Sequence, residues 1–136
     1  MNRSVGRWLV ASIVVVAAGL WLTGCASAGD VTLGERDAGK TVTLVVGEKL
    51  EIMLASNPTT GYSWQVVDDA GGIVSLSADP EYVQDPGPEV VGRGGAERLS
   101  FVAKKTGTGS ILLEYRRPWE KNVEPEKTFE VPLRVR

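Results

Sequence analysis

The fold is decided by the stretch Asn57-Pro58-Thr59-Thr60-Gly61-Tyr62-Ser63-Trp64, a short polar segment between two apolar runs that are typical of β-strands. Pro58 fixes its own φ at about −65° and suits the first central position of a turn. The two threonines that follow are β-branched and therefore stiff at χ1. Gly61 tolerates a positive φ and lets another backbone come close. Residues 57–62 are therefore expected to form a short and stiff connection between two strands. We call this connection the first loop.

Seven runs show the alternation of apolar and other residues that indicates β-strands, and no stretch after Cys25 has a sustained helical period. The predicted strands span residues 41–46, 50–55, 63–67, 73–84, 98–103, 110–116 and 128–135. The run 73–84 consists of two short candidates, 73–78 and 81–84, around Asp79-Pro80. Val31 and Leu33 open a further short strand, and turns are predicted at residues 68–72 and 104–109. This pattern predicts an all-β fold, an immunoglobulin-like antiparallel β-sandwich of about seven strands, with Trp64 buried early in the third.

The predicted order of strands brings three loops together. If successive strands run in opposite directions, every second connection lies at the same end of the sandwich. The first loop, the second loop (residues 85–95) and the third loop (residues 117–127) then form one surface. Loops that cluster at one end of a sandwich commonly bind a partner.

The second loop carries an apolar pair followed by a glycine-rich run. Val90 and Val91 precede Gly92-Arg93-Gly94-Gly95, whose backbone is open to hydrogen bonds with a partner. A phosphate cradle would need a helix after the glycines, whereas a strand is expected there. Taken alone, the loop is equally consistent with an ordinary flexible surface connection.

The third loop begins with Arg117, Pro118 and Trp119 in a charged surrounding. Tryptophan and arginine are the residues most enriched at binding hot spots. The alternative is that Trp119 folds back onto its own loop. The loop is therefore a candidate for partner contact.

The composition excludes several classes of function. The 136 residues include no histidine and a single cysteine, which removes Ser-His and Cys-His catalytic groups, histidine-type zinc sites and any internal disulfide. Carboxylate pairs such as Asp68/Asp69 and Glu124/Glu126 fall in predicted turns, where they are typical of solvated charge. The net charge of −2 gives no electrostatic reason to bind nucleic acid. We therefore expect a monomeric protein that is not an enzyme and has no metal or cofactor.

The N-terminal segment is typical of a bacterial lipoprotein signal. Arg3 and Arg7 precede the uncharged apolar run 8–22, which is shorter than a comfortable membrane span of roughly 20 residues. The run closes with Leu22-Thr23-Gly24-Cys25, which resembles a lipobox. We expect residues 1–24 to be cleaved, Cys25 to carry lipid (palmitate included), and residues 25–40 to form a tether and first short strand. The alternative is an uncleaved anchor helix with an ordinary thiol.

Three motifs in register resemble the chagasin family of cysteine-peptidase inhibitors. They are Asn57-Pro58-Thr59-Thr60-Gly61-Tyr62, Gly92-Arg93-Gly94-Gly95 and Arg117-Pro118-Trp119, and the resemblance covers about residues 41–135, nearly all of the predicted domain 41–136. It implies an immunoglobulin-like sandwich that inhibits papain-like cysteine peptidases tightly and reversibly.

The resemblance also implies how the three loops divide the work. Thr59, Thr60 and Gly61 would enter the active-site cleft above the catalytic cysteine. Val90, Val91 and the glycine run would lie along one side of the cleft, and Trp119 would pack against the other. Arg93 is a large charge within the glycine motif and leaves the subsite preference open.

A second class of function uses the same sandwich. A surface-anchored immunoglobulin-like binding or adhesion module would share the fold without inhibiting peptidases, because a fold alone does not determine a function. Either protein would be held by lipid on Cys25 at the bacterial cell envelope, outside the cytoplasm. Titration of a peptidase distinguishes the two.

Overall fold

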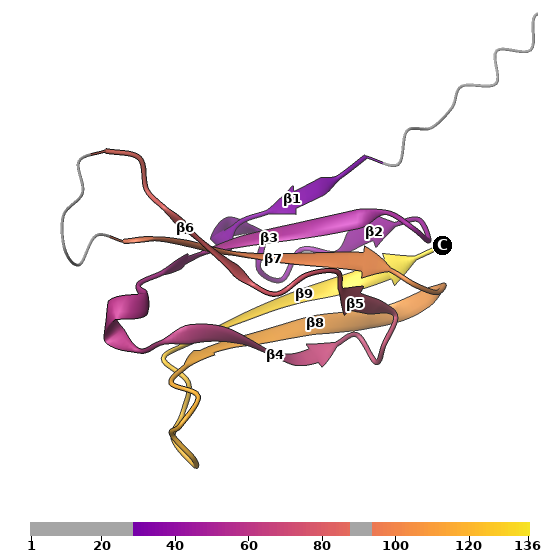
Figure 1. Cartoon of the computed structure of the whole chain (residues 1–136). Helices are drawn as coiled ribbons and strands as arrows, with labels where there is room; N and C mark the ends of the chain where they lie inside the picture. Colours follow the sequence, from indigo (N-terminus) through magenta and orange to yellow (C-terminus); the bar gives the residue numbers. More distant parts are fainter. Residues whose placement is uncertain (1–28, 88–93) are drawn as a thin grey trace, which may run out of the picture.

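Two β-sheets packed face to face make up the computed structural model, which describes residues 29–87 and 94–136 (Figure 1). The first sheet contains β1 (Val31–Leu33), β3 (Lys49–Ser56), β5 (Val74–Leu76), β6 (Glu81–Gln84) and β7 (Gly95–Ala103). The second contains β2 (Val42–Leu44), β4 (Ser63–Asp69), β8 (Gly107–Arg116) and β9 (Lys127–Val135). Two single-turn 3-10 helices, η1 (Glu35–Asp37) and η2 (Pro58–Thr60), complete the described elements.

The strand order confirms the predicted all-β, immunoglobulin-like sandwich. The first sheet runs β1-β3-β7-β5, with β6 also paired to β7, and the second runs β2-β9-β8-β4. The long strands pair antiparallel, as expected. The short edge strands β1 and β2 instead pair parallel to β3 and β9. Each of these edge strands has only three residues and adds few backbone hydrogen bonds to its sheet.

Alternation along the strands places one row of side chains of each sheet in the core. Leu50, Ile52 and Leu54 of β3 are fully buried, and Leu99 and Phe101 of β7 lie opposite them. The second sheet supplies a matching row from β8 and β9. Trp64 is 4% exposed, which confirms its predicted place in the core.

The run 73–84 holds two short strands, as predicted, and two other predicted boundaries are wrong. The run is divided into β5 and β6 with Asp79 and Pro80 between them, because proline has no N–H for the ladder. β4 continues to Asp69 through an irregularity between Val66 and Asp68, where a turn was expected. These changes leave the ends of the sandwich where the sequence predicted them.

The second wrong boundary is the start of β8, which lies at Gly107 inside the predicted turn 104–109. A Cβ on Gly109 would come within 2.9 Å of the Ala70 side chain, and one on Gly107 within 3.0 Å of Ile73. These glycines let the strand pass close to the turn after β4. In residues 29–87 and 94–136 no helix has the length and apolar character needed to cross a bilayer.

Candidate functional site

Strand pairing brings the three loops to one end of the sandwich, as predicted. Ser56, the last residue of β3, pairs with Gly95, which also pairs with Gln84 before the second loop. In the other sheet, Arg116 at the start of the third loop pairs with Ser63, just after the first loop. The described parts of these connections lie at the left of Figure 1. We call this the loop end.

The first loop is fixed by its own hydrogen bonds. The Asn57 carboxamide oxygen accepts hydrogen bonds from the Thr59 N–H at 3.2 Å and the Thr59 hydroxyl at 2.6 Å. The Thr60 hydroxyl donates to the Asn57 carbonyl at 2.7 Å. Gly61 closes the turn with φ at +80°, which confirms the predicted need for glycine. These hydrogen bonds hold Thr59 and Thr60 in place, while Pro58, Thr59 and Thr60 stay exposed to solvent.

A buried carboxylate holds both stems of the first loop. Glu97 of β7 is 6% exposed. Its two oxygens accept hydrogen bonds from the Ser56 hydroxyl at 2.7 Å and from the Trp64 N–H at 2.8 Å. Ser56 precedes the loop and Trp64 follows it, so one side chain fixes the distance between its two ends.

Sequence reasoning did not identify Glu97 as part of the site. A usable signal was present, because Glu97 has the same strand parity as Leu99 and Phe101, which point into the core. An acidic residue at an inward position needs hydrogen-bond donors, and the adjacent loop stems are the nearest source of them.

Aromatic side chains support the loop from below. Tyr115 of β8 stacks on Tyr62 with ring centroids 5.3 Å apart, and its ring lies 5.2 Å from that of Trp64. The Tyr115 hydroxyl accepts a hydrogen bond from the Asn57 N–H at 3.0 Å. The Trp64 indole N–H donates to the Ala55 carbonyl at 3.1 Å. The loop therefore rests on an aromatic layer that continues into the core.

Arg117 connects the third loop to the first. Its Nε donates to the Thr60 carbonyl at 3.1 Å, and its guanidinium lies 4.5 Å from the Tyr62 ring centroid. A second guanidinium nitrogen pairs with Glu120 at 3.2 Å. The side chain predicted to contact a peptidase thus has three partners within its own domain. Its direct contact with a peptidase stays a prediction.

Trp119 extends this connection at the surface. Its side chain is 67% exposed, yet the outer edge of its indole lies against Gly61. A Cβ on Gly61 would collide with that ring. Trp119 therefore packs on the first loop instead of folding back onto its own, and the two loops form one continuous surface.

The second loop is described only at its ends. Val90, Val91, Gly92 and Arg93 lie outside the described residues, so their predicted roles are untested. The loop ends at Gly94, because Gly95 is a buried residue of β7. A Cβ on Gly95 would collide with the Val83 carbonyl, so this glycine lets β6 approach β7 and is not an open binding backbone.

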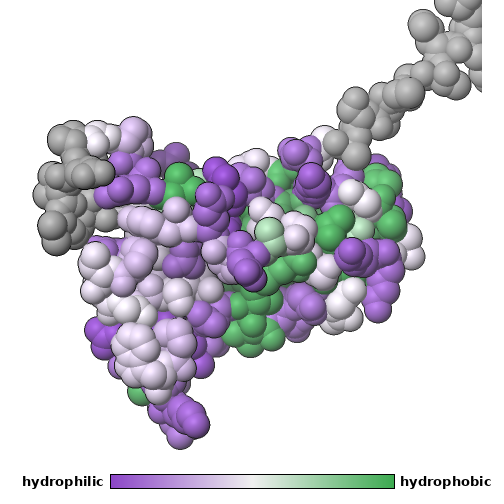
Figure 2. Space-filling view, viewed as in Figure 1, coloured by the Kyte–Doolittle hydropathy of each residue, from purple (hydrophilic) through white to green (hydrophobic). Residues whose placement is uncertain are grey.

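The surface of the loop end mixes side chains of intermediate hydropathy with hydrophilic ones. Figure 2 shows pale side chains at its left-hand end, with purple ones among them. Pro58, Thr59 and Thr60 are exposed at the tip of the first loop, and Pro118 and Trp119 beside them. Such small or amphipathic side chains suit a surface that is alternately wet and buried against a protein partner.

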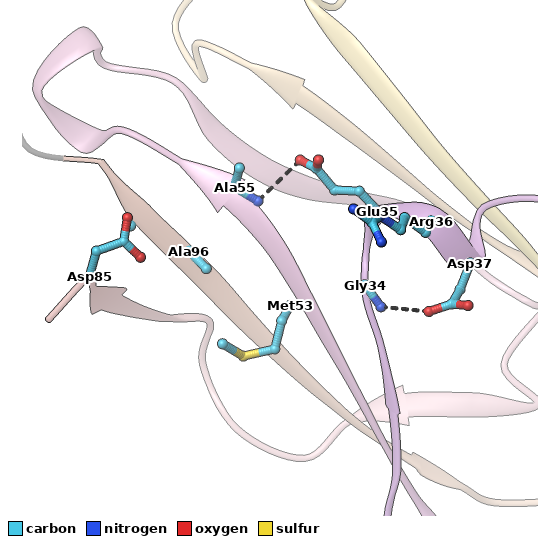
Figure 3. A pocket seen from close by; sticks show the side chains of 9 residues that line it. Gly34, Glu35, Arg36, Asp37, Met53, Ala55, Asp85 and Ala96 are labelled. Carbon is cyan, nitrogen blue, oxygen red and sulfur yellow. Dashed lines mark hydrogen bonds between the residues drawn. The ribbon is translucent and has the colours of Figure 1, made fainter.

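A hollow of about 490 Å³ lies beside the loop end on the outer face of the first sheet (Figure 3). It opens where β1 ends, and the Glu35 carboxylate replaces the missing strand by accepting a hydrogen bond from the Ala55 N–H at 3.3 Å. The Gly34 N–H and the Lys40 ammonium both donate hydrogen bonds to the Asp37 carboxylate. These two contacts lower the pKa of Asp37. These contacts cap the edge of β3. Nowhere in the described ranges do three metal-ligating side chains gather.

Comparison with known proteins finds relatives that match most of this domain. Residues 43–133 match the model of the chagasin family peptidase inhibitors. The chain is 42% identical to amoebiasin-1 of Entamoeba histolytica over 106 residues, which cover 77% of this chain and 99% of that protein. It is 33% identical to chagasin of Trypanosoma cruzi over 100 residues, covering 71% of this chain and 90% of the relative.

A solved structure agrees with the sequence relatives. The crystal structure of a cysteine protease inhibitor from Entamoeba histolytica superposes with a TM-score of 0.70 at 30% identity. The superposition covers 79% of this chain and 96% of the other. The similarity therefore extends over nearly the whole described sandwich.

Proposed function

The chain belongs to the chagasin family of peptidase inhibitors, and we propose that it inhibits papain-like cysteine peptidases tightly and reversibly by filling their active-site cleft. A papain-like cleft is a groove with a reactive thiolate at its floor. A rigid loop that fits the groove can cover the thiolate without reacting with it. The inhibitor needs no catalytic group of its own for this purpose.

The observation that carries the proposal is the bracing of the exposed first loop. Glu97 fixes its two stems, Asn57 fixes its tip, and Arg117 ties it to the third loop. A loop that is ordered before binding loses little conformational entropy when it enters a cleft. Exposed threonine and proline side chains at the tip are small enough to enter a narrow groove.

The loops have separate roles in this proposal. Thr59, Thr60 and Gly61 lie over the catalytic cysteine, while Asn57, Pro58 and Tyr62 support them. Trp119, with Pro118, packs against an aromatic wall of the peptidase on one side. The second loop contacts the opposite side through Val90, Val91 and the residues 92–94. Flanking contacts of this kind add area and keep the first loop out of the register of a cleavable substrate.

Titration of papain with the folded domain tests the proposal. Activity of active-site-titrated papain is measured against increasing concentrations of residues 26–136. A monomeric inhibitor gives stoichiometric loss of activity at one domain per active site, and activity returns on dilution. Full papain activity in a molar excess of folded domain would overturn the proposal and favour the adhesion module.

We further propose that the domain is held at the bacterial cell envelope by lipid on Cys25. The basic start, the apolar run and Leu22-Thr23-Gly24-Cys25 support this location. Two or more acyl chains anchor a protein durably, whereas one gives marginal binding. The Cys25→Ser variant should accumulate as an unprocessed precursor on a denaturing gel, and mass spectrometry of the normal protein should show acyl chains. Recovery of a soluble, unmodified mature protein from cells would contradict this.

A further inference from the structure

The end of the sandwich opposite the loop end carries basic side chains that form no ion pair with any residue the structure describes. Lys49 begins β3, Lys104 and Lys105 follow β7, and Arg134 and Arg136 lie at the end of β9. Strand pairing joins these elements, since Lys49 pairs with Val102 and Val135 pairs with both Leu44 and Gly107. All five cations are exposed. We call these five residues the basic pole.

Ion pairing distinguishes these cations from several others. Lys40, Arg98, Arg116 and Arg117 each pair with a carboxylate. None of the five residues of the basic pole forms such a pair within ranges 29–87 and 94–136. The positive charge of this end is therefore available to a partner.

Four acidic residues lie at the same end, one fewer than the cations: Asp30, Glu48, Asp68 and Asp69. Three of them accept hydrogen bonds from the backbone, and the Asp68 carboxylate accepts one from the Gly71 N–H at 3.0 Å. The Glu48 carboxylate accepts a hydrogen bond from the Val45 N–H at 2.7 Å. The Asp69 carboxylate accepts one from the Gly72 N–H at 2.8 Å. Asp30, next to β1, is exposed. The five cations thus outnumber the side-chain carboxylates of this end by one, although the whole chain has a net charge of −2.

Apolar side chains lie among the charges. Val45 and Val46, in the turn between β2 and β3, are 47% and 46% exposed. Their turn is held against the basic pole, because the Val46 N–H donates to the Arg136 carbonyl and the Gly47 N–H to the Ala103 carbonyl. Figure 2 shows hydrophobic surface beside hydrophilic surface at the corresponding right-hand end. Mixed basic and apolar surface suits the headgroup region of a bilayer.

The chain enters the sandwich at this same end. Val31 of β1 pairs with Leu50 near the start of β3, whereas β3 reaches the first loop at Ser56. Five residues separate Cys25 from Val31 in the sequence. At no more than about 3.6 Å per residue, they hold the basic pole within roughly 20 Å of an anchored cysteine.

We propose that the basic pole docks on the anionic headgroups of the membrane that carries the lipid on Cys25. This inference rests on the proposed anchoring, and it adds an orientation to it. Docking through the basic pole places the loop end on the far side of the domain, separated by about 25 Å of β-strand. The three loops then face away from the bilayer, where a peptidase can reach them.

The experiment uses residues 26–136, which carry no lipid. A relative aligned over 106 residues consists almost wholly of this domain, since the alignment covers 99% of it, so the domain is a self-sufficient unit. Flotation with vesicles of phosphatidylcholine, with and without phosphatidylglycerol, measures its partition. We expect binding only to the anionic vesicles, with loss in high salt because screening shortens electrostatic reach.

Two charge-matched variants locate the contact. Lys49→Gln/Lys104→Gln/Lys105→Gln should weaken binding to anionic vesicles at least about tenfold, because each basic residue near an anionic surface adds affinity. Arg36→Gln/Lys121→Gln/Lys127→Gln removes the same charge nearer the loop end and should change binding less than about twofold. Circular dichroism confirms that both variants are folded. Equal losses, or equal binding to neutral vesicles, would overturn the proposal.

Two further measurements distinguish membrane docking from binding to a soluble polyanion and test the proposed orientation. Retention by a soluble polyanion such as heparin, without flotation on vesicles, would assign the basic pole to a soluble partner and overturn the membrane contact. Papain inhibition is measured with the domain free and vesicle-bound, and we expect equal inhibition. Inhibition lost only on vesicles would overturn the orientation. Inhibition absent in both states would contradict the proposed function while leaving the docking result intact.

Discussion

At the scale of single residues, Gly61 meets two requirements at once. Its φ of +80° closes the first loop, and its missing side chain leaves room for the Trp119 ring. The sequence predicted the first requirement, because glycine after Pro58 and two threonines is typical of a tight turn. The second depends on a contact between two loops that are distant in sequence, which no local pattern contains.

Gly61→Ala should therefore displace Trp119 and weaken inhibition. The left-handed conformation costs alanine roughly 1–2 kcal/mol, and the new methyl group collides with the indole. We expect the inhibition constant for papain to rise by at least about tenfold. Indole fluorescence should report the displaced ring.

Gly39→Ala is the matched control for this prediction. Gly39 has φ at +78°, and nothing lies within 4 Å of a Cβ placed there. It reproduces the conformational cost of Gly61→Ala without the collision. If both variants inhibit papain equally, the contact between Trp119 and Gly61 has no part in binding.

Glu97 supplies a second test at the scale of residues. Glu97→Ala leaves the Ser56 hydroxyl and the Trp64 N–H without their acceptor, and each buried unpaired donor costs about 1–3 kcal/mol. The free energy of unfolding in denaturant should fall accordingly. Inhibition should weaken too, because the stems of the first loop lose their fixed separation.

Two variants separate positioning from general stability. Glu97→Gln keeps one acceptor for Trp64 and an amide that can donate to Ser56, so it should restore most of the inhibition. Glu51→Ala removes a carboxylate from the outer face of β3 and should leave inhibition unchanged. If Glu97→Ala is less stable but inhibits normally at a temperature where it is fully folded, Glu97 serves the core alone.

At the scale of elements, alternation of apolar side chains predicted the long strands well, because each buries one face. The prediction failed where the alternation breaks. The irregularity between Val66 and Asp68 shifts the pattern, so the end of β4 read as a turn. The parallel pairing of β1 and β2 was also beyond prediction, since three residues carry almost no information about direction.

The proposed role of the third loop requires that Trp119 contributes to binding and not to the stability of the core. Trp119→Ala should leave the free energy of unfolding within about 1 kcal/mol of normal, because the side chain is 67% exposed. Binding to papain should weaken by about 2 kcal/mol or more, as expected of a hot spot. Denaturant unfolding and inhibition kinetics measure the two effects separately.

Trp64→Ala should show the opposite pattern. Trp64 is 4% exposed and contacts Tyr115, so its loss leaves a cavity and costs about 3–5 kcal/mol of stability. The indole N–H bond to Ala55 disappears as well. Unfolding of the domain by Trp119→Ala instead would show that the third loop belongs to the core, contrary to the proposed role.

At the scale of the whole molecule, the two ends of the sandwich differ in chemistry. The loop end exposes small and aromatic side chains, and the basic pole exposes valines beside cations that form no ion pair in the described part of the chain. Topology separates them, because every long strand runs from one end to the other. The sequence predicted which loops meet, since it contains the order of the strands. The basic pole was not predicted, because its cations come from three separate segments.

The proposed mechanism of the whole domain predicts inhibition without chemistry. If the first loop only covers the catalytic thiolate, papain whose cysteine carries a small alkyl group should still bind the domain, though more weakly because the tip of the loop is crowded. Binding to the alkylated enzyme is measured by calorimetry, since that enzyme has no activity to inhibit. A trypsin-like serine peptidase is the control and should not bind, because its cleft lacks a matching wall for Trp119 and specificity is a difference between affinities. Complete loss of binding on alkylation, with any group that fits the free cleft, would mean that the thiolate itself takes part and that simple occlusion is wrong.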